Sequence, residues 1–252
     1  MGARHVIRHM SVLVILCGLV ACSGDSLRLD AAEVNGMGTL GISARGHDVK
    51  GVIVYFHGSD QNASVIEYSE KHRVFFDPLL RAGYAVVAAD ADGNAYGNPT
   101  SRKAYRDLMA AAANKYEVPV TWFVAESMGA LAALALLSED TEKKIKGMVG
   151  ITPMMGIPAY IRTTRFIAEA WGGTVPESAD PLSWPPEAFA GREIRLYVAD
   201  DDRVIPRAAT GRDFAKKFDG TANVEVIDCP GKHVASECYR GEDVEKWMAE
   251  IG

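Results

Sequence analysis

Short apolar runs alternate with amphipathic helical patterns along most of the chain. The runs at 52–56, 84–89 and 118–124 are rich in valine, alanine and aromatic residues, as strands buried on both faces are. Strands that alternate with helices in this way predict an α/β fold, with a mostly parallel sheet covered by helices on both faces. The expected strands are 38–44, 52–56, 84–89, 118–124, 145–151, 194–198 and 224–227, and the expected helices are 74–81, 101–115, 130–137, 208–218 and 243–251.

Residues 1–21 follow a different pattern and are predicted to be an export signal. Arg4 and Arg8 precede an apolar stretch, 12–20, that is too short to span a bilayer comfortably. It ends in Leu19-Val20-Ala21-Cys22, which resembles the lipobox of bacterial lipoproteins, where cleavage before the cysteine leaves a lipidated N-terminus. We therefore expect an exported protein of the bacterial cell envelope, membrane-anchored through Cys22 on the periplasmic or outer face. An ordinary signal peptide cut after Ala21 is the alternative.

The rest of the chain has the size of one domain. We expect a tether at 22–36, a folded domain at 37–252 and, at the long connection 153–192, a small cap. The formal net charge is −6, and removal of the signal would take away the positive charges of Arg4 and Arg8 as well. An acidic chain without lysine and arginine clusters binds nucleic acid poorly, so we expect no nucleic-acid partner. We also expect a monomer.

Ser127 lies where a predicted strand meets a predicted helix. Gly129 follows two residues later, and an alanine-rich helical pattern then begins. This arrangement predicts a tight turn with the serine hydroxyl at its tip, as in the nucleophile elbow of serine hydrolases. Ala125 stands where that motif usually has its first glycine. The alternative is a serine that only caps the helix.

A nucleophilic serine needs a base and a carboxylate, and later segments of the chain offer both. After His72 the chain has a single further histidine, His233, in a late loop where this type of sheet places the base. The apolar run 194–198 leads into Asp200, Asp201 and Asp202, so a carboxylate follows a strand between the serine and the histidine. Serine, aspartate and histidine in this order are expected of an α/β-hydrolase.

An oxyanion hole is predicted after the strand at 52–56, which ends at His57-Gly58-Ser59. The glycine lets the backbone amide of Ser59 face a substrate oxygen, and the amide of Met128 is the expected second donor. His57 precedes the serine in the chain, so we expect it to support this loop rather than to act as the base.

Four short motifs resemble those of the α/β-hydrolase superfamily, and more closely those of its serine esterase and lipase branch. They are His57-Gly58-Ser59, Ala125-Glu126-Ser127-Met128-Gly129, Asp202-Arg203-Val204-Ile205-Pro206 and Gly231-Lys232-His233. The resemblance extends over about residues 38–250. In that family the acid usually lies four residues before a proline, a register that selects Asp202 over its two neighbours.

The resemblance implies an α/β-hydrolase fold and a serine hydrolase that cleaves carboxylic esters through an acyl-enzyme. Ser127, His233 and Asp202 would form its triad, and no cofactor is expected. The substrate would be a small-molecule ester or an ester of the cell envelope. The alternatives are an envelope acyltransferase or a peptidase on the same fold, and a non-catalytic binding lipoprotein.

Residues that line the substrate pocket are expected in loops at the carboxyl ends of the strands. The sequence offers no CxxC pair or HExxH spacing for a metal. The glycine-containing segment 93–99 is predicted to form turns and not a phosphate-binding loop. Packing in the core or the cap is the alternative role for each pocket candidate. The candidates are Tyr96, Met154, Met155, Tyr160, Trp171 and Trp184.

Cys229 and Cys238 are the cysteines that remain once Cys17 leaves with the signal and Cys22 is lipidated. They lie on either side of His233, and export would place them in an oxidising compartment. An isolated pair there is usually bridged, so we expect a disulfide that staples the histidine loop. Two buried free thiols and a Cys-His-Cys metal site are the alternatives.

Overall fold

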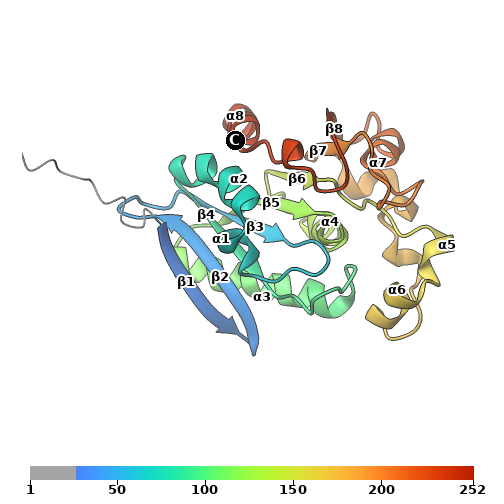
Figure 1. Ribbon diagram of the computed structural model, residues 1–252, viewed down its shortest axis with the longest axis horizontal. Helices are drawn as coiled ribbons and strands as arrows, with labels where there is room; N and C mark the ends of the chain where they lie inside the picture. The colour runs from blue at the N-terminus through green and yellow to red at the C-terminus, as the bar shows by residue number, and fades with distance from the viewer. Residues whose placement is uncertain (1–26) are drawn as a thin grey trace, which may run out of the picture.

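The computed structural model describes residues 27–252, so the predicted export signal and Cys22 lie outside the described residues. Eight strands form one sheet in the order β1-β2-β4-β3-β5-β6-β7-β8 (Figure 1). Strand β2 pairs antiparallel with β1 and with β4, and every pair from β4 to β8 is parallel. The predicted fold class is therefore confirmed. The strands are β1 Leu27–Val34, β2 Met37–Ala44, β3 Gly51–Phe56, β4 Tyr84–Ala89, β5 Val120–Glu126, β6 Gly147–Ile151, β7 Glu193–Ala199 and β8 Asn223–Cys229.

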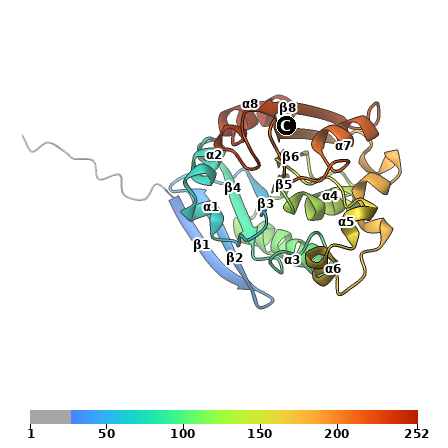
Figure 2. The ribbon, with the colours of Figure 1, turned by 45° about the vertical axis from the view of Figure 1, so that its right-hand side comes forward.

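Helices cover both faces of the sheet (Figures 1 and 2). Helices α3, α4 and α7 pack on one face, and α1, α2 and α8 pack on the other. Successive residues of β3 face these two layers in turn, as the pleat of a strand requires. The helices are α1 Val65–Tyr68, α2 Glu70–Arg81, α3 Pro99–Tyr116, α4 Gly129–Glu139, α5 Ala159–Arg162, α6 Arg165–Ala170, α7 Gly211–Lys217 and α8 Gly241–Ile251.

The N-terminal hairpin corrects one prediction. Strand β1 pairs with β2 along its whole length, so the prediction of a tether through residue 36 is wrong for residues 27–34. Asn35 and Gly36 form the connecting turn with φ values of 52° and 77°, as a two-residue hairpin turn of the Asn-Gly type requires. Strand β1 is an edge strand with no buried residue, so it lacks the continuous apolar run by which the other strands are predicted.

The long connection at 153–192 contains α5, α6 and three single 3-10 turns, Glu177–Ala179, Pro181–Ser183 and Pro186–Phe189. Met154, Ile157, Ile161, Ile167 and Val175 of this segment gather around Leu131 of α4 in a cluster separate from the two layers of the main core. In Figure 2 this segment lies beside α4, on the side of the sheet away from β1. No helix among residues 27–252 is long and apolar enough to cross a membrane.

Candidate active site

Ser127 lies in a strained turn between β5 and α4. Its φ is 47°, in the left-handed region that a non-glycine residue seldom adopts. The turn is held from β6, because the amide of Ser127 donates to Ile151 O at 3.1 Å and its carbonyl accepts from Met154 N at 2.9 Å. A Cβ at Gly129 would lie well inside contact distance of the carbonyl oxygens at the end of β3. Glycine at this position therefore lets α4 start against β3, as the sequence pattern predicts.

Three side chains that are far apart in the sequence form one row of hydrogen bonds. His233 Nε2 lies 2.9 Å from Ser127 Oγ, and His233 Nδ1 lies 2.8 Å from Asp202 Oδ2. The other carboxylate oxygen of Asp202 accepts from the amides of Val204 at 2.9 Å and Ile205 at 3.1 Å. The side chains of His233 and Asp202 are only 13% and 10% exposed. The row is thus largely shielded from water and its orientation is fixed from both ends.

The charge of Asp202 is stabilised by its hydrogen bonds. Burial by itself raises the pKa of this carboxyl. The hydrogen bond from His233 and those from the amides of Ile205 and Val204 outweigh burial and hold the pKa below its usual range. An ionised Asp202 accepts a hydrogen bond from His233 Nδ1–H, which leaves Nε2 as the acceptor that faces Ser127.

The structure separates the three consecutive aspartates by their partners. Asp200 Oδ1 accepts from the amide of Gly231 at 2.8 Å, and Asp201 Oδ1 accepts from Arg203 Nε at 2.8 Å on the surface. Among the three, Asp202 is the one that reaches His233. This is the residue that the register to the proline selects.

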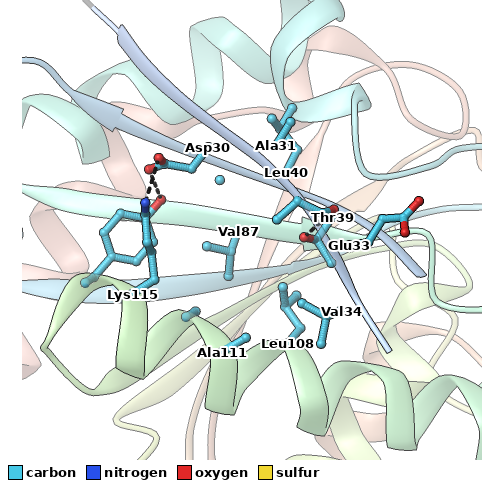
Figure 3. A pocket seen from close by; sticks show the side chains of 14 residues that line it. Asp30, Ala31, Glu33, Val34, Thr39, Leu40, Val87, Leu108, Ala111 and Lys115 are labelled. Atoms are coloured by element: carbon cyan, nitrogen blue, oxygen red, sulfur yellow. Dashed lines mark hydrogen bonds and ion pairs between the residues drawn. The ribbon is translucent and has the colours of Figure 1, made fainter. Parts of the chain in front are cut away.

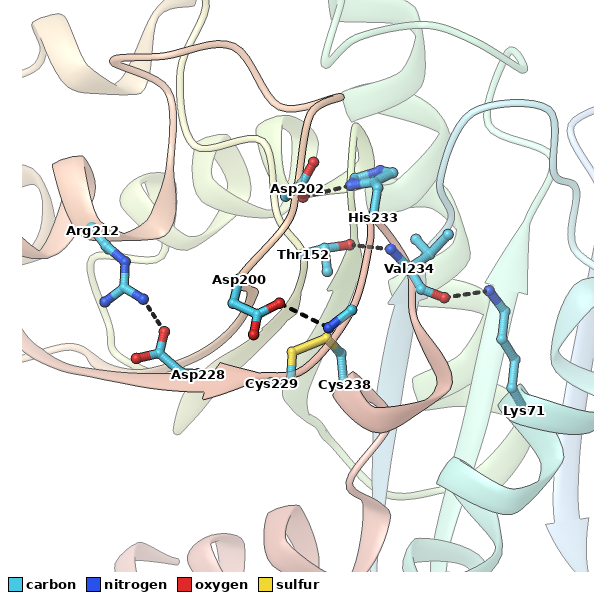
Figure 4. Close-up of a disulfide and its surroundings, with 11 residues drawn as sticks. Lys71, Thr152, Asp200, Asp202, Arg212, Asp228, Cys229, His233, Val234 and Cys238 are labelled. Atoms are coloured by element: carbon cyan, nitrogen blue, oxygen red, sulfur yellow. Dashed lines mark hydrogen bonds and ion pairs between the residues drawn. A yellow bond between two sulfur atoms is a disulfide. The ribbon is translucent and has the colours of Figure 1, made fainter.

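The histidine loop is stapled by the predicted disulfide (Figure 4). Cys229 and Cys238 are bonded, with their Cα atoms 5.3 Å apart. Val234, next to the histidine, has a φ of 53° and is held on both sides. Its amide donates to Thr152 Oγ1 at 3.3 Å, and its carbonyl accepts from Lys71 Nζ at 3.2 Å. The loop is therefore fixed to α2 and to the residue that follows β6, in addition to its own disulfide.

The predicted oxyanion residues lie beside Ser127. Ser59 and Met128 line the same pocket as the serine, and Ser59 Oγ lies 3.7 Å from Met128 Sδ. His57 is buried, and its ring nitrogens lie 3.0 Å from Asp90 O and 2.8 Å from Gly58 O. These contacts place the His57 ring in support of the loop and away from Ser127, as expected.

An apolar pocket of about 130 Å³ opens at Ser127. Tyr96 and Met154 line it, as the sequence predicts. Trp171 supports the wall from behind, since its Nε1 donates to Tyr96 O at 3.1 Å. Further apolar walls, which the sequence patterns do not reveal, come from the cap segment and from the residues that follow Asp202. They are Ile161, Phe166, Ile167, Val204, Ile205 and Pro206.

Three of the predicted pocket residues lie elsewhere. Met155 is fully buried in the core on the α3 and α4 face, whereas its chain neighbour Met154 lines the pocket. Trp184 stacks on Phe189 with ring centroids 5.8 Å apart and donates to the chain within the cap segment. Tyr160 is mostly exposed and donates to the carbonyl of Arg207. The predictions for Met155, Tyr160 and Trp184 as pocket-lining residues are therefore wrong.

A larger cavity, of about 330 Å³, lies between the β1–β2 hairpin and α3 (Figure 3). Asp30 in its wall accepts from Lys115 at 3.3 Å and from the hydroxyl of Tyr116 at 3.1 Å. It lacks a pairing of serine and histidine like the one at Ser127. In the described part of the chain, residues 27–252, no group of His, Cys, Asp and Glu side chains is arranged to hold a metal ion.

The chain belongs to the α/β-hydrolase family. A sequence model described as "Alpha/beta hydrolase family" matches residues 53–250. No curated protein matches the sequence.

Several solved structures share the fold at low sequence identity. Est1E from Butyrivibrio proteoclasticus is 16% identical with a TM-score of 0.65, and the match covers 88% of this chain and 98% of that one. An S-formylglutathione hydrolase from Agrobacterium tumefaciens is 15% identical with a TM-score of 0.67, covering 90% and 95%. The esterase PF2001 from Pyrococcus furiosus is 18% identical with a TM-score of 0.66, covering 90% and 91%.

Proposed function

We propose that the protein is a serine hydrolase that cleaves carboxylic esters through an acyl-enzyme. The observation that carries this proposal is the row of hydrogen bonds from Ser127 through His233 to Asp202, which ends at an apolar pocket. One of the similar structures, PF2001 from Pyrococcus furiosus, is named an esterase, which supports an ester as the substrate.

In the proposed reaction, Ser127 Oγ attacks the ester carbonyl carbon while His233 Nε2 takes the hydroxyl proton. The carbonyl oxygen becomes an oxyanion that the amides of Ser59 and Met128 stabilise. The tetrahedral intermediate collapses, the bond to the alkoxy oxygen breaks, and His233 gives its proton to the departing alcohol. Asp202 keeps the imidazole in the required tautomer and stabilises its protonated form.

Water then completes the cycle. It attacks the acyl-enzyme carbonyl as His233 removes one of its protons, and collapse of the second intermediate returns that proton to Ser127 Oγ and releases the acid. The pocket of about 130 Å³ is close in size to a dry apolar cavity of about 150 Å³ that holds benzene. It therefore suits a short apolar acyl group.

Release of p-nitrophenol from p-nitrophenyl acetate and butyrate tests the proposal. Ser127→Ala should abolish the activity and His233→Ala should nearly do so, because each removes one end of the proton transfer. Full activity in Ser127→Ala would contradict the mechanism. Added acceptor alcohols test the alternative of an acyltransferase, which would convert the ester to a new ester instead of the free acid.

We further propose that the protein is exported and held at a bacterial membrane through a lipid on Cys22. The support comes from the sequence Leu19-Val20-Ala21-Cys22 after a short apolar stretch. The native protein should partition into the detergent phase of a two-phase extraction, and Cys22→Ser should abolish the lipid modification without loss of catalysis. Partition of the native protein into the aqueous phase would favour ordinary secretion.

A further inference from the structure

A buried carboxylate lies directly beneath the serine. Glu126 is the last residue of β5 and is 1% exposed, although it is a charged residue. Along β5, Trp122 and Val124 face the layer of α2 and α8. Because side chains alternate along a strand, Glu126 points into that same layer, away from the pocket that Ser127 faces. Its side chain therefore serves something other than direct contact with the substrate.

Four donors surround this carboxylate. Oε2 accepts from the hydroxyls of Tyr55 at 2.9 Å and Tyr239 at 2.5 Å and lies 2.9 Å from His72 Nε2. Oε1 accepts from Gln61 Nε2 at 2.5 Å. Burial by itself raises the pKa of Glu126, but the hydrogen bond and charge of His72 and the hydroxyl of Tyr239 lower it to about 2. Glu126 is therefore ionised at neutral pH and acts only as an acceptor.

Gln61 connects this carboxylate to the loop that follows β3. Because an ionised Glu126 only accepts hydrogen bonds, the amide nitrogen of Gln61 must face it, and Gln61 Oε1 must face the other way. There Oε1 accepts from the backbone amide of Gly58 at 3.0 Å. A Cβ at Gly58 would lie 2.7 Å from Glu126 Oε1, so glycine is what lets the loop approach the carboxylate.

We propose that Glu126 is a positioning residue: through Gln61 it fixes the amide of Gly58, and with it the adjoining amide of Ser59, for oxyanion binding next to Ser127. This inference rests on the proposed esterase function. Oxyanion donors are effective because they already point at the site where charge develops, and a loop segment keeps such an orientation only if something holds it. The hydrogen bonds of Gln61 connect the segment at Gly58 to Glu126, the residue that precedes Ser127.

The variant Gln61→Leu tests this link between Glu126 and Gly58. It removes both hydrogen bonds of the Gln61 side chain, the one to Glu126 and the one from Gly58, and leaves strand β5 intact. With p-nitrophenyl butyrate, we expect kcat to fall about 10- to 100-fold, since loss of a whole oxyanion donor costs about 100- to 1,000-fold. KM should change less than about threefold, because the donors act in the transition state. Binding of a trifluoromethyl ketone that forms a tetrahedral adduct should weaken by the same factor as kcat/KM falls.

Two further variants complete the test. Glu126→Gln should lower kcat with little change in KM. The new amide oxygen must face the three donors now at Oε2, so its NH₂ group faces Gln61 Nε2 and two donors oppose each other. Tyr239→Phe is the matched control: it removes a donor from the same carboxylate on the side away from the loop. It should lower the melting temperature but keep kcat within about twofold. All assays are run at 25 °C on variants whose folding is checked by circular dichroism.

The outcomes separate this inference from the proposed function. A folded Gln61→Leu enzyme with wild-type kcat overturns the inference alone, as does a loss confined to KM. Equal losses of kcat in Gln61→Leu and Tyr239→Phe would also overturn it. They would show that Glu126 stabilises the fold and does not position the loop through Gln61. An inactive wild-type protein, or activity that survives Ser127→Ala, overturns the proposed function itself. If Glu126→Gln does not fold, Gln61→Leu still decides.

Discussion

Replacement of Asp202 by asparagine would switch the proposed base, His233, to the wrong tautomer. The amides of Val204 and Ile205 both donate to Asp202 Oδ1, so an asparagine must turn its carbonyl oxygen toward them. Its NH₂ group then faces His233 Nδ1, which lies 2.8 Å from the other oxygen of Asp202. The imidazole must accept there and carry its proton on Nε2. In that tautomer it cannot take the proton of Ser127.

We expect kcat for ester hydrolysis to fall by about 10⁴-fold in Asp202→Asn, which corresponds to about 5 kcal/mol of barrier. Asp201→Asn is the matched control, because the side chain of Asp201 pairs with Arg203 on the surface, and kcat should stay within about twofold of wild type. Asp200→Asn should give a small loss through the turn at Gly231. A folded Asp202→Asn enzyme within tenfold of wild type would refute this reasoning.

Three further predictions concern the loop, the buried carboxylate and the pocket. The double variant Cys229→Ser with Cys238→Ser should lower stability by about 2.5–3 kcal/mol, seen as a fall in melting temperature of about 5–10 °C, and should lower kcat as His233 loosens. The pKa of Glu126 is lowered from 4.5 to about 2 on folding, so its stabilisation is complete above pH 5 and disappears as the pH falls toward 2. In wild type, the free energy of unfolding measured in urea should therefore fall by about 3 kcal/mol more between pH 5 and pH 2 than it does in Glu126→Gln. An equal fall in the two proteins would contradict the lowered pKa. Phe166→Ala removes a pocket wall and should reduce the advantage of butyrate over acetate esters severalfold in kcat/KM, because each buried methylene contributes about 0.8 kcal/mol; an unchanged preference would place the acyl group elsewhere.

The sequence predicts the central sheet well because its strands are buried on both faces. Each of the seven predicted strands is present in the structure, with ends that differ by a few residues. Strand β1 is missing from the prediction because an edge strand that is half exposed carries no apolar run. Helix α2 begins at Glu70, earlier than predicted, because its first turn is polar; His72 in that turn is nevertheless buried against Glu126.

The candidate site likewise has a part that the sequence predicts and a part that it does not. Ser127, Asp202 and His233 could be predicted to come together because each follows a strand of a parallel sheet, and the carboxyl ends of such strands meet at one edge. The walls of the pocket could not be predicted, because Phe166 belongs to a short helix in a long connection that has no regular periodicity. Glu126 gave a signal that the sequence analysis missed: a lone charge at the end of an apolar strand must find partners within the fold.

Covalent labelling with a fluorophosphonate probe tests the central claim most directly. The probe reacts with a serine that a neighbouring base activates, and the labelled residue can be identified by mass spectrometry of the peptides. We predict a single modification on Ser127 in the wild-type protein, a strongly reduced rate in His233→Ala and no labelling in Ser127→Ala. Absence of labelling in folded wild-type protein, or labelling of a different residue, would contradict the proposal that Ser127 is an activated nucleophile.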